Sequence, residues 1–405
     1  MQPEIDFRGI SLNITEAIFL AVCGLWLIAF LLKKVKIRWD PIYIVFGLYA
    51  LGLFLSAAFS ENPRTSFIKY LGELYLIGLA VMTITTVDSE RMLKRVAFAW
   101  LAASTITAAI GVATVLMFYL GFESWVSVFA LNGFGSLPAG NYPRIQSTFL
   151  YPAMLCNYLT VSLMILLAAY NVGWVRTVVF IVLASAFMFA IAFTLTPGIG
   201  GVVLAAGIWY WFQMKDRGKP IAANLTLFAG IAIAAGFWLV STFTVIASPT
   251  SPFHYKVAGV RIDPTQRLLT WIDASRTFMA HPVLGKGLGL PVAEVYFMPP
   301  SGQMQLLTDA HNFLLNIAAQ AGLAGVVPLV MICVWVLNRR SYDRKDPNNT
   351  SAINLALWIA FLSAFIYQGL VGSFEDARHL WVLIGLLIAT STLDRQSDSG
   401  PNVMP

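Results

Sequence analysis

Three residues of this chain have side chains suited to transferring a group away from a phosphorylated leaving group: Arg144, Arg267 and His311. An arginine guanidinium keeps its positive charge and binds a phosphate or diphosphate through paired N–H groups. A histidine imidazole can accept a proton near neutral pH. Each residue alone also has an ordinary role, because an arginine near a membrane surface can reach the lipid headgroups and a histidine can be structural. A site therefore requires that the three residues come together.

The chain contains few polar segments. It is 58% hydrophobic and 11% charged, with a mean hydropathy of +0.73. A soluble domain has about a quarter of its residues charged. The longest polar segment is 246–311, and it contains Arg267 and His311. A charge at the centre of a bilayer costs about 3 kcal/mol or more, so we expect this segment outside the hydrocarbon.

Apolar runs on both sides of this segment are long enough to cross a bilayer, which requires about twenty residues. The sequence predicts eleven spans, at 14–32, 41–59, 66–87, 96–120, 148–170, 175–195, 198–214, 223–246, 322–338, 351–370 and 380–393. The run 311–321 could be a separate half-helix, which would give twelve. The predicted fold is an all-α polytopic integral membrane protein of about 11–12 transmembrane helices. It forms a single domain over 1–405, with a long helical loop at 247–310 and a disordered cytoplasmic tail at 395–405.

Basic residues concentrate in alternate short loops, at 33–38, 91–95, 176, 215–219, 339–345 and 395. The positive-inside rule places these loops in the cytoplasm and the loop 247–310 on the outer or periplasmic side. The net charge of +6 is explained by these loops, so it does not indicate nucleic-acid binding. The three cysteines fall in apolar runs without zinc-site spacing, and we expect them to be core residues.

One helix is predicted inside the long loop. Asp263 suits its N-cap, Pro264 its first position, and Gln266 a capping-box partner. Pro282 is expected to end it. Arg267 then lies in the first turn of this helix.

His311 is expected at the start of the helix that re-enters the membrane. Asn312, Asn316 and Gln320 follow at intervals of four, so they form one polar stripe on a helix. Such a stripe at a membrane normally faces the protein interior or a water-filled cavity. Asp309, two residues before His311, either favours the charged imidazolium or orients the ring, and the sequence leaves this open.

Lys69 and Glu73 are four residues apart near the outer end of the third span, which favours an internal ion pair. Lys69 could also add a third cation to an anion site. The glycine-rich run 285–289 lacks the patterns of phosphate-binding loops and is interpreted as a turn that lets backbone segments pack closely. No carboxylate or histidine spacing indicates a metal site, and residues 375–379 are interpreted as a hinge of surface charges between two spans.

Several segments together resemble one known superfamily, the lipopolysaccharide O-antigen ligases and O-antigen polymerases. They are Arg144-Ile145-Gln146-Ser147-Thr148-Phe149, Arg267 with Trp271, residues 282–289, His311-Asn312-Phe313-Leu314-Leu315, and Ala321-Gly322-Leu323-Ala324-Gly325. The chain departs from the family at two places. Ser147 stands where the family often has glycine, and Thr196-Pro197-Gly198 stands where it often has Ser-Arg-Gly, so no phosphate role is expected of that turn.

The resemblance implies a metal-independent, inverting glycosyltransferase of the GT-C type. It would be a multi-pass protein of the bacterial inner membrane with its active site facing the periplasm. It would ligate O-antigen polysaccharide from undecaprenyl pyrophosphate onto lipid A–core, without a cofactor and without nucleic acid. Arg144 and Arg267 would bind the pyrophosphate, with Lys69 as a candidate third cation, and His311 would be the catalytic base.

Other functions remain open at this stage. An O-antigen polymerase uses the same donor with a second lipid-linked repeat as acceptor, and a protein O-glycosyltransferase is also similar. The compact chain with one dominant outer loop favours the ligase. A transporter of lipid-linked sugars would need a polar path across the membrane, and the spans between 176 and 215 and the last two spans contain almost no mid-membrane charge.

Overall fold

The computed structural model describes residues 4–7, 10–35, 37, 39–122, 130–131, 142–244, 255–257, 260–297, 304–340 and 349–398. A helix coincides with each of the eleven predicted spans. Their bounds are α1 (Ile14–Leu31), α2 (Ile42–Ala58), α3 (Pro63–Thr86), α4 (Glu90–Tyr119), α6 (Pro152–Asn171), α7 (Thr177–Phe193), α8 (Ile199–Asp216), α9 (Pro220–Thr242), α11 (Phe313–Leu337), α12 (Asn349–Ala360) and α13 (Arg378–Asp398). A π-helix, η1 (Phe361–Tyr367), continues α12.

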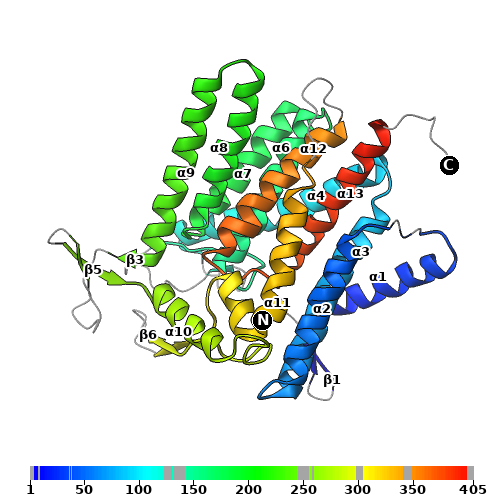
Figure 1. Cartoon of the computed structure of the whole chain (residues 1–405). Helices are drawn as coiled ribbons and strands as arrows, with labels where there is room; N and C mark the ends of the chain where they lie inside the picture. Colours follow the sequence, from blue (N-terminus) through cyan, green and yellow to red (C-terminus); the bar gives the residue numbers. More distant parts are fainter. Residues whose placement is uncertain are drawn as a thin grey trace.

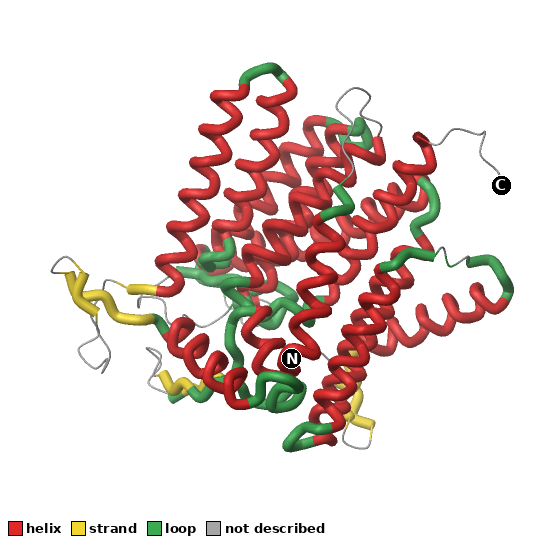
Figure 2. The backbone as a smooth tube through the Cα atoms, viewed as in Figure 1, coloured by secondary structure: helices red, strands yellow, loops and turns green. Residues whose placement is uncertain are grey.

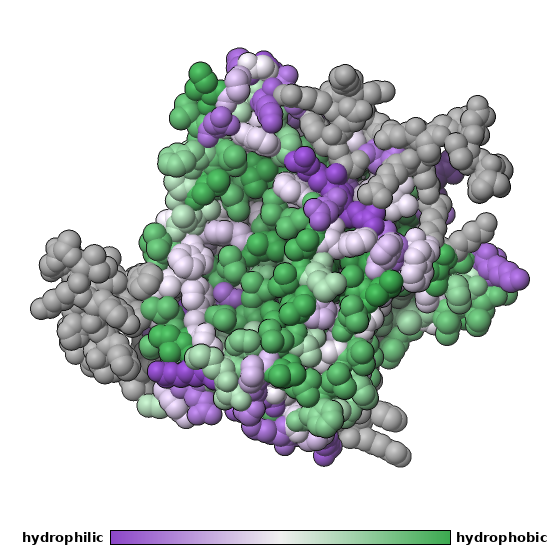
Figure 3. Space-filling view, in the orientation of Figure 1, coloured by the Kyte–Doolittle hydropathy of each residue, from purple (hydrophilic) through white to green (hydrophobic). Residues whose placement is uncertain are grey.

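Six of the described helical segments are long and apolar enough to cross a membrane, namely α3, α4, α6, α9, α11 and α12 with η1. Three further apolar helices, Ile18–Leu31 of α1, α2 and α7, are shorter. Hydrophobic residues cover the middle of the helical bundle, and hydrophilic residues gather at its two ends (Figure 3). The protein is therefore an all-α polytopic membrane protein, as the sequence predicts.

The helices form one bundle with two distinct ends (Figures 1 and 2). We call the end that carries the turn between α8 and α9, with Lys215, Arg217 and Lys219, the basic end. We call the opposite end, reached by the C-terminal end of α9 and the start of α11, the loop end. At the basic end, Arg339 after α11 forms an ion pair of 2.7 Å with Asp40 before α2.

The core of the bundle lies around α6, α12 and α13. In α6 and in the α12–η1 segment, 72% of the most apolar window is buried inside the protein. Trp381, Phe361 and Phe365 are among the largest fully buried side chains. This buried centre holds the ends of the helices in fixed positions at the loop end.

Short antiparallel sheets, which the sequence analysis did not predict, add to the helices. β1 (Glu4–Phe7) pairs with β2 (Ile10–Asn13). β5 (Val260–Pro264) lies between β3 (Phe243–Thr244) and β4 (Tyr255–Val257). β6 (Val295–Phe297) pairs with β7 (Gln305–Leu307). Strands this short contain too little periodicity to be recognised in a sequence.

The predicted loop helix exists as α10 (Gln266–Ala280), but its predicted start was wrong by two residues. Thr265 is the N-cap, whereas Asp263 and Pro264 belong to β5 and pair with Thr244 and Phe243. The strand pairing keeps those two residues extended. The backbone N–H of Thr265 then donates to Thr242 at the end of α9, at 3.0 Å.

The C-terminal ends of α10 and α13 were also predicted from the sequence. α10 ends at its C-cap His281, directly before Pro282, as predicted. The last helix continues to Asp398, so residues 395–398 of the predicted tail are helical. Residues 399–405 lie outside the described residues.

Candidate active site

The helix that follows His311 is broken. Gly322 has φ 61° and ψ −157° inside α11, so 313–321 is a half-helix separated by a kink from the rest. This confirms the half-helix that the sequence left as an alternative. A break of this kind leaves backbone N–H and C=O groups without their helical partners, and such groups are costly when buried.

The segment 282–290 supplies those partners. The N–H groups of Lys286 and Gly287 donate to the carbonyls of Ala319 (2.9 Å) and Gln320 (3.0 Å). Beyond the break, Leu323 and Ala324 donate to Pro282 (2.8 Å) and Val283 (3.0 Å). The loop therefore completes the hydrogen bonding of the helix across its kink.

Glycine is required at this junction because the two backbones touch. A Cβ at Gly285 would lie 2.2 Å from the carbonyl carbon of Gln320, and one at Gly322 would lie 2.4 Å from the carbonyl carbon of Val283. Both residues also have positive φ, which favours glycine. The interpretation of the glycine-rich run as a close-packing turn agrees with these contacts.

The polar stripe on the half-helix faces the protein interior, as predicted, and its side chains are buried. Asn312 caps α11 by accepting from the N–H groups of Leu314 and Leu315. Asn316 donates to Glu375 at 2.5 Å, and the side chain of Gln320 accepts from Gly289 N at 2.7 Å. The stripe thus joins the half-helix to the loops around it.

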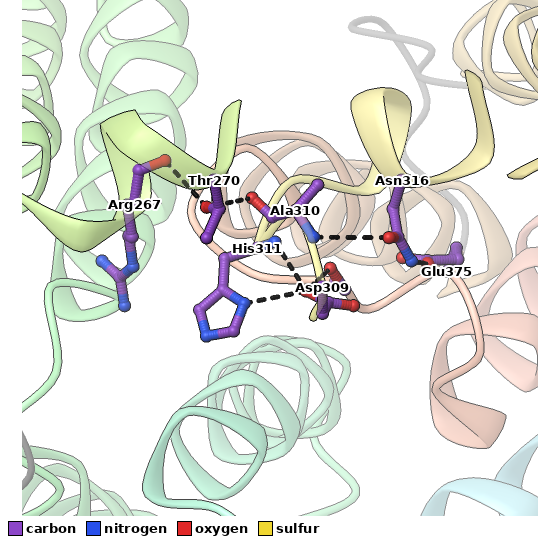
Figure 4. Close-up of polar contacts among 8 residues, drawn as sticks. Arg267, Thr270, Asp309, Ala310, His311, Asn316 and Glu375 are labelled. Carbon is purple, nitrogen blue, oxygen red and sulfur yellow. Dashed lines mark hydrogen bonds and ion pairs between the residues drawn. The ribbon is translucent and has the colours of Figure 1, made fainter. Parts of the chain in front are cut away.

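His311 stands directly before this cap and is paired with Asp309. Its ring Nδ1 lies 2.8 Å from Asp309 Oδ1, and its backbone N–H donates to the same oxygen at 2.6 Å (Figure 4). An ionised carboxylate only accepts hydrogen bonds, so Nδ1 carries a proton, and in the neutral ring Nε2 holds the lone pair. Nε2 has no hydrogen-bond partner among the described residues, and 36% of the side chain is exposed. The contact with Asp309 orients the ring, which is one of the two roles that the sequence left open.

Asp309 is itself held in place. Ser373, in the loop between η1 and α13, donates to Asp309 Oδ1 at 2.5 Å. Burial alone would raise the pKa of the Asp309 carboxyl, but the hydrogen bonds and charge of His311 and the bond from Ser373 outweigh burial, and the pKa is lowered. The carboxylate is therefore ionised at neutral pH.

The backbone of His311 lies in the left-handed region, with φ 51°. This conformation is uncommon for residues other than glycine and costs about 1 kcal/mol or more. The bond from its backbone N–H to Asp309 compensates for part of this cost. Strained residues of this kind occur often at functional sites.

Arg267 is brought to His311 by the packing of α10 on the start of α11. Thr270, one turn further along α10, donates to the Arg267 carbonyl (2.9 Å) and to the Ala310 carbonyl (3.2 Å). A tilted ring contact between Trp271 and Trp238, with centroids 5.7 Å apart, holds α10 against the end of α9. Figure 4 shows the guanidinium of Arg267 and the ring of His311 pointing to the same side of these segments.

No described residue supplies an anion that compensates the charge of Arg267. Among the described residues, none accepts a hydrogen bond from its guanidinium or forms an ion pair with it. Burial, together with the nearby charge of Arg144, lowers the pKa of Arg267 to about 10. The group remains cationic at neutral pH and would be stabilised by an anion bound beside it.

Arg144 reaches the same region from the segment before α6. Ile145 forms a bridge with Leu131 and donates to the Phe193 carbonyl at 3.0 Å, and Arg144 Nε donates to the Thr194 carbonyl at 3.2 Å. The charge of Arg144 contributes to the lowered pKa of Arg267, so the two arginines belong to the same region of the protein. Ser147, where the family often has glycine, has φ 52°, so this position uses the backbone conformation that glycine adopts most easily.

Lys69 forms the ion pair that the sequence favoured. Its Nζ lies 3.6 Å from Glu73 and 2.9 Å from Asp376 in the loop before α13. Two carboxylates therefore compensate its charge. Its role as a third cation for an anion stays a prediction.

Asp309 and Ser373 were not among the site residues predicted from the sequence. The two-residue spacing of Asp309 and His311 was visible, because an aspartate often accepts hydrogen bonds from the backbone two residues further on. Ser373 is distant in sequence, and no local signal marks it. Within the described part of the chain, no group of three or more His, Cys, Asp or Glu residues is placed to hold a metal ion.

The arrangement combines an imidazole paired with a carboxylate and two arginines of the same region, at the loop end of a membrane bundle. A family model described as O-antigen ligase matches residues 180–330, which include Arg267, His311 and the break at Gly322. Arg144 and Lys69 precede the matched segment. No curated protein matches the chain. Over residues 180–330 the family match confirms the predicted similarity of the chain to the O-antigen ligase superfamily.

Proposed function

We propose that this protein is a glycosyltransferase of the bacterial inner membrane that ligates O-antigen polysaccharide from undecaprenyl pyrophosphate onto lipid A–core in the periplasm. The observation that carries the proposal is the Asp309–His311 pair beside Arg267. The family match supports the same substrate class.

The two arginines suit the leaving group. Cleavage of the bond between the sugar and the lipid diphosphate moves an electron pair, and hence negative charge, onto the diphosphate. Fixed guanidiniums in a partly buried site stabilise such charge without having to reorganise. Arg267, whose charge is not compensated by any of the described residues, and the nearby Arg144 fit this role.

His311 suits the acceptor. Its Nε2 would take the proton of the acceptor hydroxyl while the oxygen attacks the anomeric carbon. Asp309 fixes the tautomer and stabilises the imidazolium that forms, and the imidazolium then returns its proton to water. Attack opposite the departing diphosphate inverts the anomeric configuration.

Reconstitution of the purified protein with lipid-linked O-antigen and lipid A–core tests this function. The expected product is lipid A–core that carries the whole glycan, seen as a single-step shift on a gel. His311→Ala should abolish the shift. His281→Ala is a matched control, because His281 is an exposed histidine at the C-terminal end of α10 and should leave activity unchanged.

Two results would contradict the proposed ligase activity and indicate another function. A ladder of products on the lipid carrier would indicate a polymerase. Movement of lipid-linked glycan between the leaflets without a new glycosidic bond would indicate a transporter.

A further inference from the structure

A groove lies far from the candidate active site, between α6, α7 and α8. Its volume is about 330 Å³. Most of its walls are apolar, formed by residues such as Leu163, Leu167, Phe180, Met188 and Trp209. The exposed Ala206 on α8 leaves room at its centre.

One end of the groove is polar and basic. Asn171, Gln213 and Arg217 line it there, at the ends of α6 and α8. Gln213 and Arg217 are four residues apart and therefore share a helix face. Arg176 stands one turn before the lining residue Phe180 on α7. None of the lining residues is acidic.

The length of the groove matches one leaflet of a bilayer. Its lining residues run from Val202 to Arg217 on α8, about 22 Å at 1.5 Å per residue. The hydrocarbon of one leaflet is about 15 Å thick, and the headgroup region adds to this. The polar end then lies at headgroup depth and the apolar end near the middle of the membrane.

We propose that this groove binds one anionic phospholipid of the leaflet at the basic end. Its acyl chain occupies the apolar walls, and its phosphate contacts Arg217 and Gln213. The polyprenyl tail of a donor fits less well, because its diphosphate would lie at the loop end, one full helix away. This exclusion of the donor tail rests on the proposed function, whereas the shape and charge of the groove do not.

Native mass spectrometry of the detergent-purified protein with added dioleoyl phosphatidylglycerol tests the site. The wild type should retain one lipid more firmly than the others. Arg217→Ala should lower its affinity by about fivefold, as expected for one basic group at a lipid headgroup. Ala206→Trp should displace the lipid by filling the groove.

Two matched variants serve as controls. Lys219→Ala removes a charge from the same turn outside the groove, and Ala232→Trp adds a large side chain at an exposed position of α9. Both should retain the lipid, and all four variants should keep the thermal unfolding midpoint of the wild type. If Ala206→Trp fails to fold, Arg217→Ala beside Lys219→Ala still decides the question.

Equal weakening by Arg217→Ala and Lys219→Ala would overturn the proposal, because the lipid would then be attracted by general surface charge. Retention of the lipid by a folded Ala206→Trp variant would also overturn it. Displacement of the lipid by an equal concentration of undecaprenyl phosphate would identify the polyprenyl carrier as the occupant.

Discussion

At the scale of single residues, the site depends on one carboxylate oxygen. Asp309 Oδ1 accepts from the backbone N–H of His311, from its ring Nδ1 and from Ser373. These bonds fix the position, the tautomer and the strained backbone of the histidine together. Nε2 is thereby presented as the basic atom.

His311→Ala is expected to lower turnover by about a hundred- to ten-thousand-fold, the usual cost of losing a general base. Donor binding should survive, because the arginines remain. Turnover and donor affinity of the variant, measured beside wild type, check this. If His311→Ala loses activity only because it no longer binds the donor, His311 is a phosphate ligand and not the base.

The wild-type rate should fall in acid, because a protonated imidazole cannot accept a proton. Asp309 should not contribute to this fall. Its pKa is lowered by folding, so the stabilisation from its ionised form is complete above the usual aspartate value of about 3.9 and is lost only at lower pH. A pH–rate profile for wild type and Asp309→Asn separates the two groups. In the variant the rate should be lower at every pH, and a profile identical to wild type would remove Asp309 from the mechanism.

Arg144→Lys and Arg267→Lys should both impair ligation strongly, because lysine retains the charge but loses the paired N–H groups. Alanine at either position should be worse. The assay is ligation rate together with donor affinity in folded protein. If an alanine variant ligates at a near-normal rate, the arginine it replaces contacts lipid headgroups and does not bind the diphosphate.

Activity is expected to be insensitive to EDTA, since the reaction as proposed uses guanidiniums where other enzymes use a divalent cation. Ligation assayed with and without chelator checks this. Activity that EDTA abolishes and magnesium or manganese restores would contradict it.

At the scale of elements, the broken helix α11 and the segment 282–290 form one structural unit. Their backbones exchange four hydrogen bonds, and glycines allow the contact. The unit places His311 at one end and, through Thr270 and Ala310, aligns α10 beside it. Its rigidity therefore determines the distance between the histidine and Arg267.

Gly285→Ala is expected to destabilise the protein by about 2 kcal/mol or more, because its Cβ would clash with the backbone of Gln320 at positive φ. Gly236→Ala is the matched control. A Cβ there meets no atom within 4 Å on α9, so the change should be neutral or stabilise by up to about 1 kcal/mol. Thermal unfolding in detergent compares the two. Equal midpoints would show that the junction tolerates a side chain.

At the scale of the whole molecule, the helices could be predicted and their assembly could not. Apolar runs such as 223–246 and 322–338 indicate spans directly, because the bilayer requires them. The start of α10 was misplaced because β5 pairs with a strand that no local signal marks. Likewise, Arg144 and Arg267 could be placed at one membrane face but not beside each other. Their approach depends on the turn after α7 and on contacts between distant segments.

The two ends of the bundle are expected to face opposite sides of the membrane. Glu294→Cys, an exposed position at the loop end, should react with an impermeant maleimide in intact spheroplasts. Lys219→Cys, at the basic end, should react only after lysis. The opposite pattern would reverse the orientation and place the candidate site in the cytoplasm.

The junction at Gly322 also determines what can be exchanged between this protein and its relatives. A chimera that replaces the outer segment but retains the native α11 would pair the kink with a foreign loop. Any mismatch would leave backbone groups unbonded near the membrane, at a cost of several kcal/mol each. The smallest transplantable module therefore runs from His281 through Gly325, across what a hydropathy plot would divide into a soluble loop and a transmembrane helix.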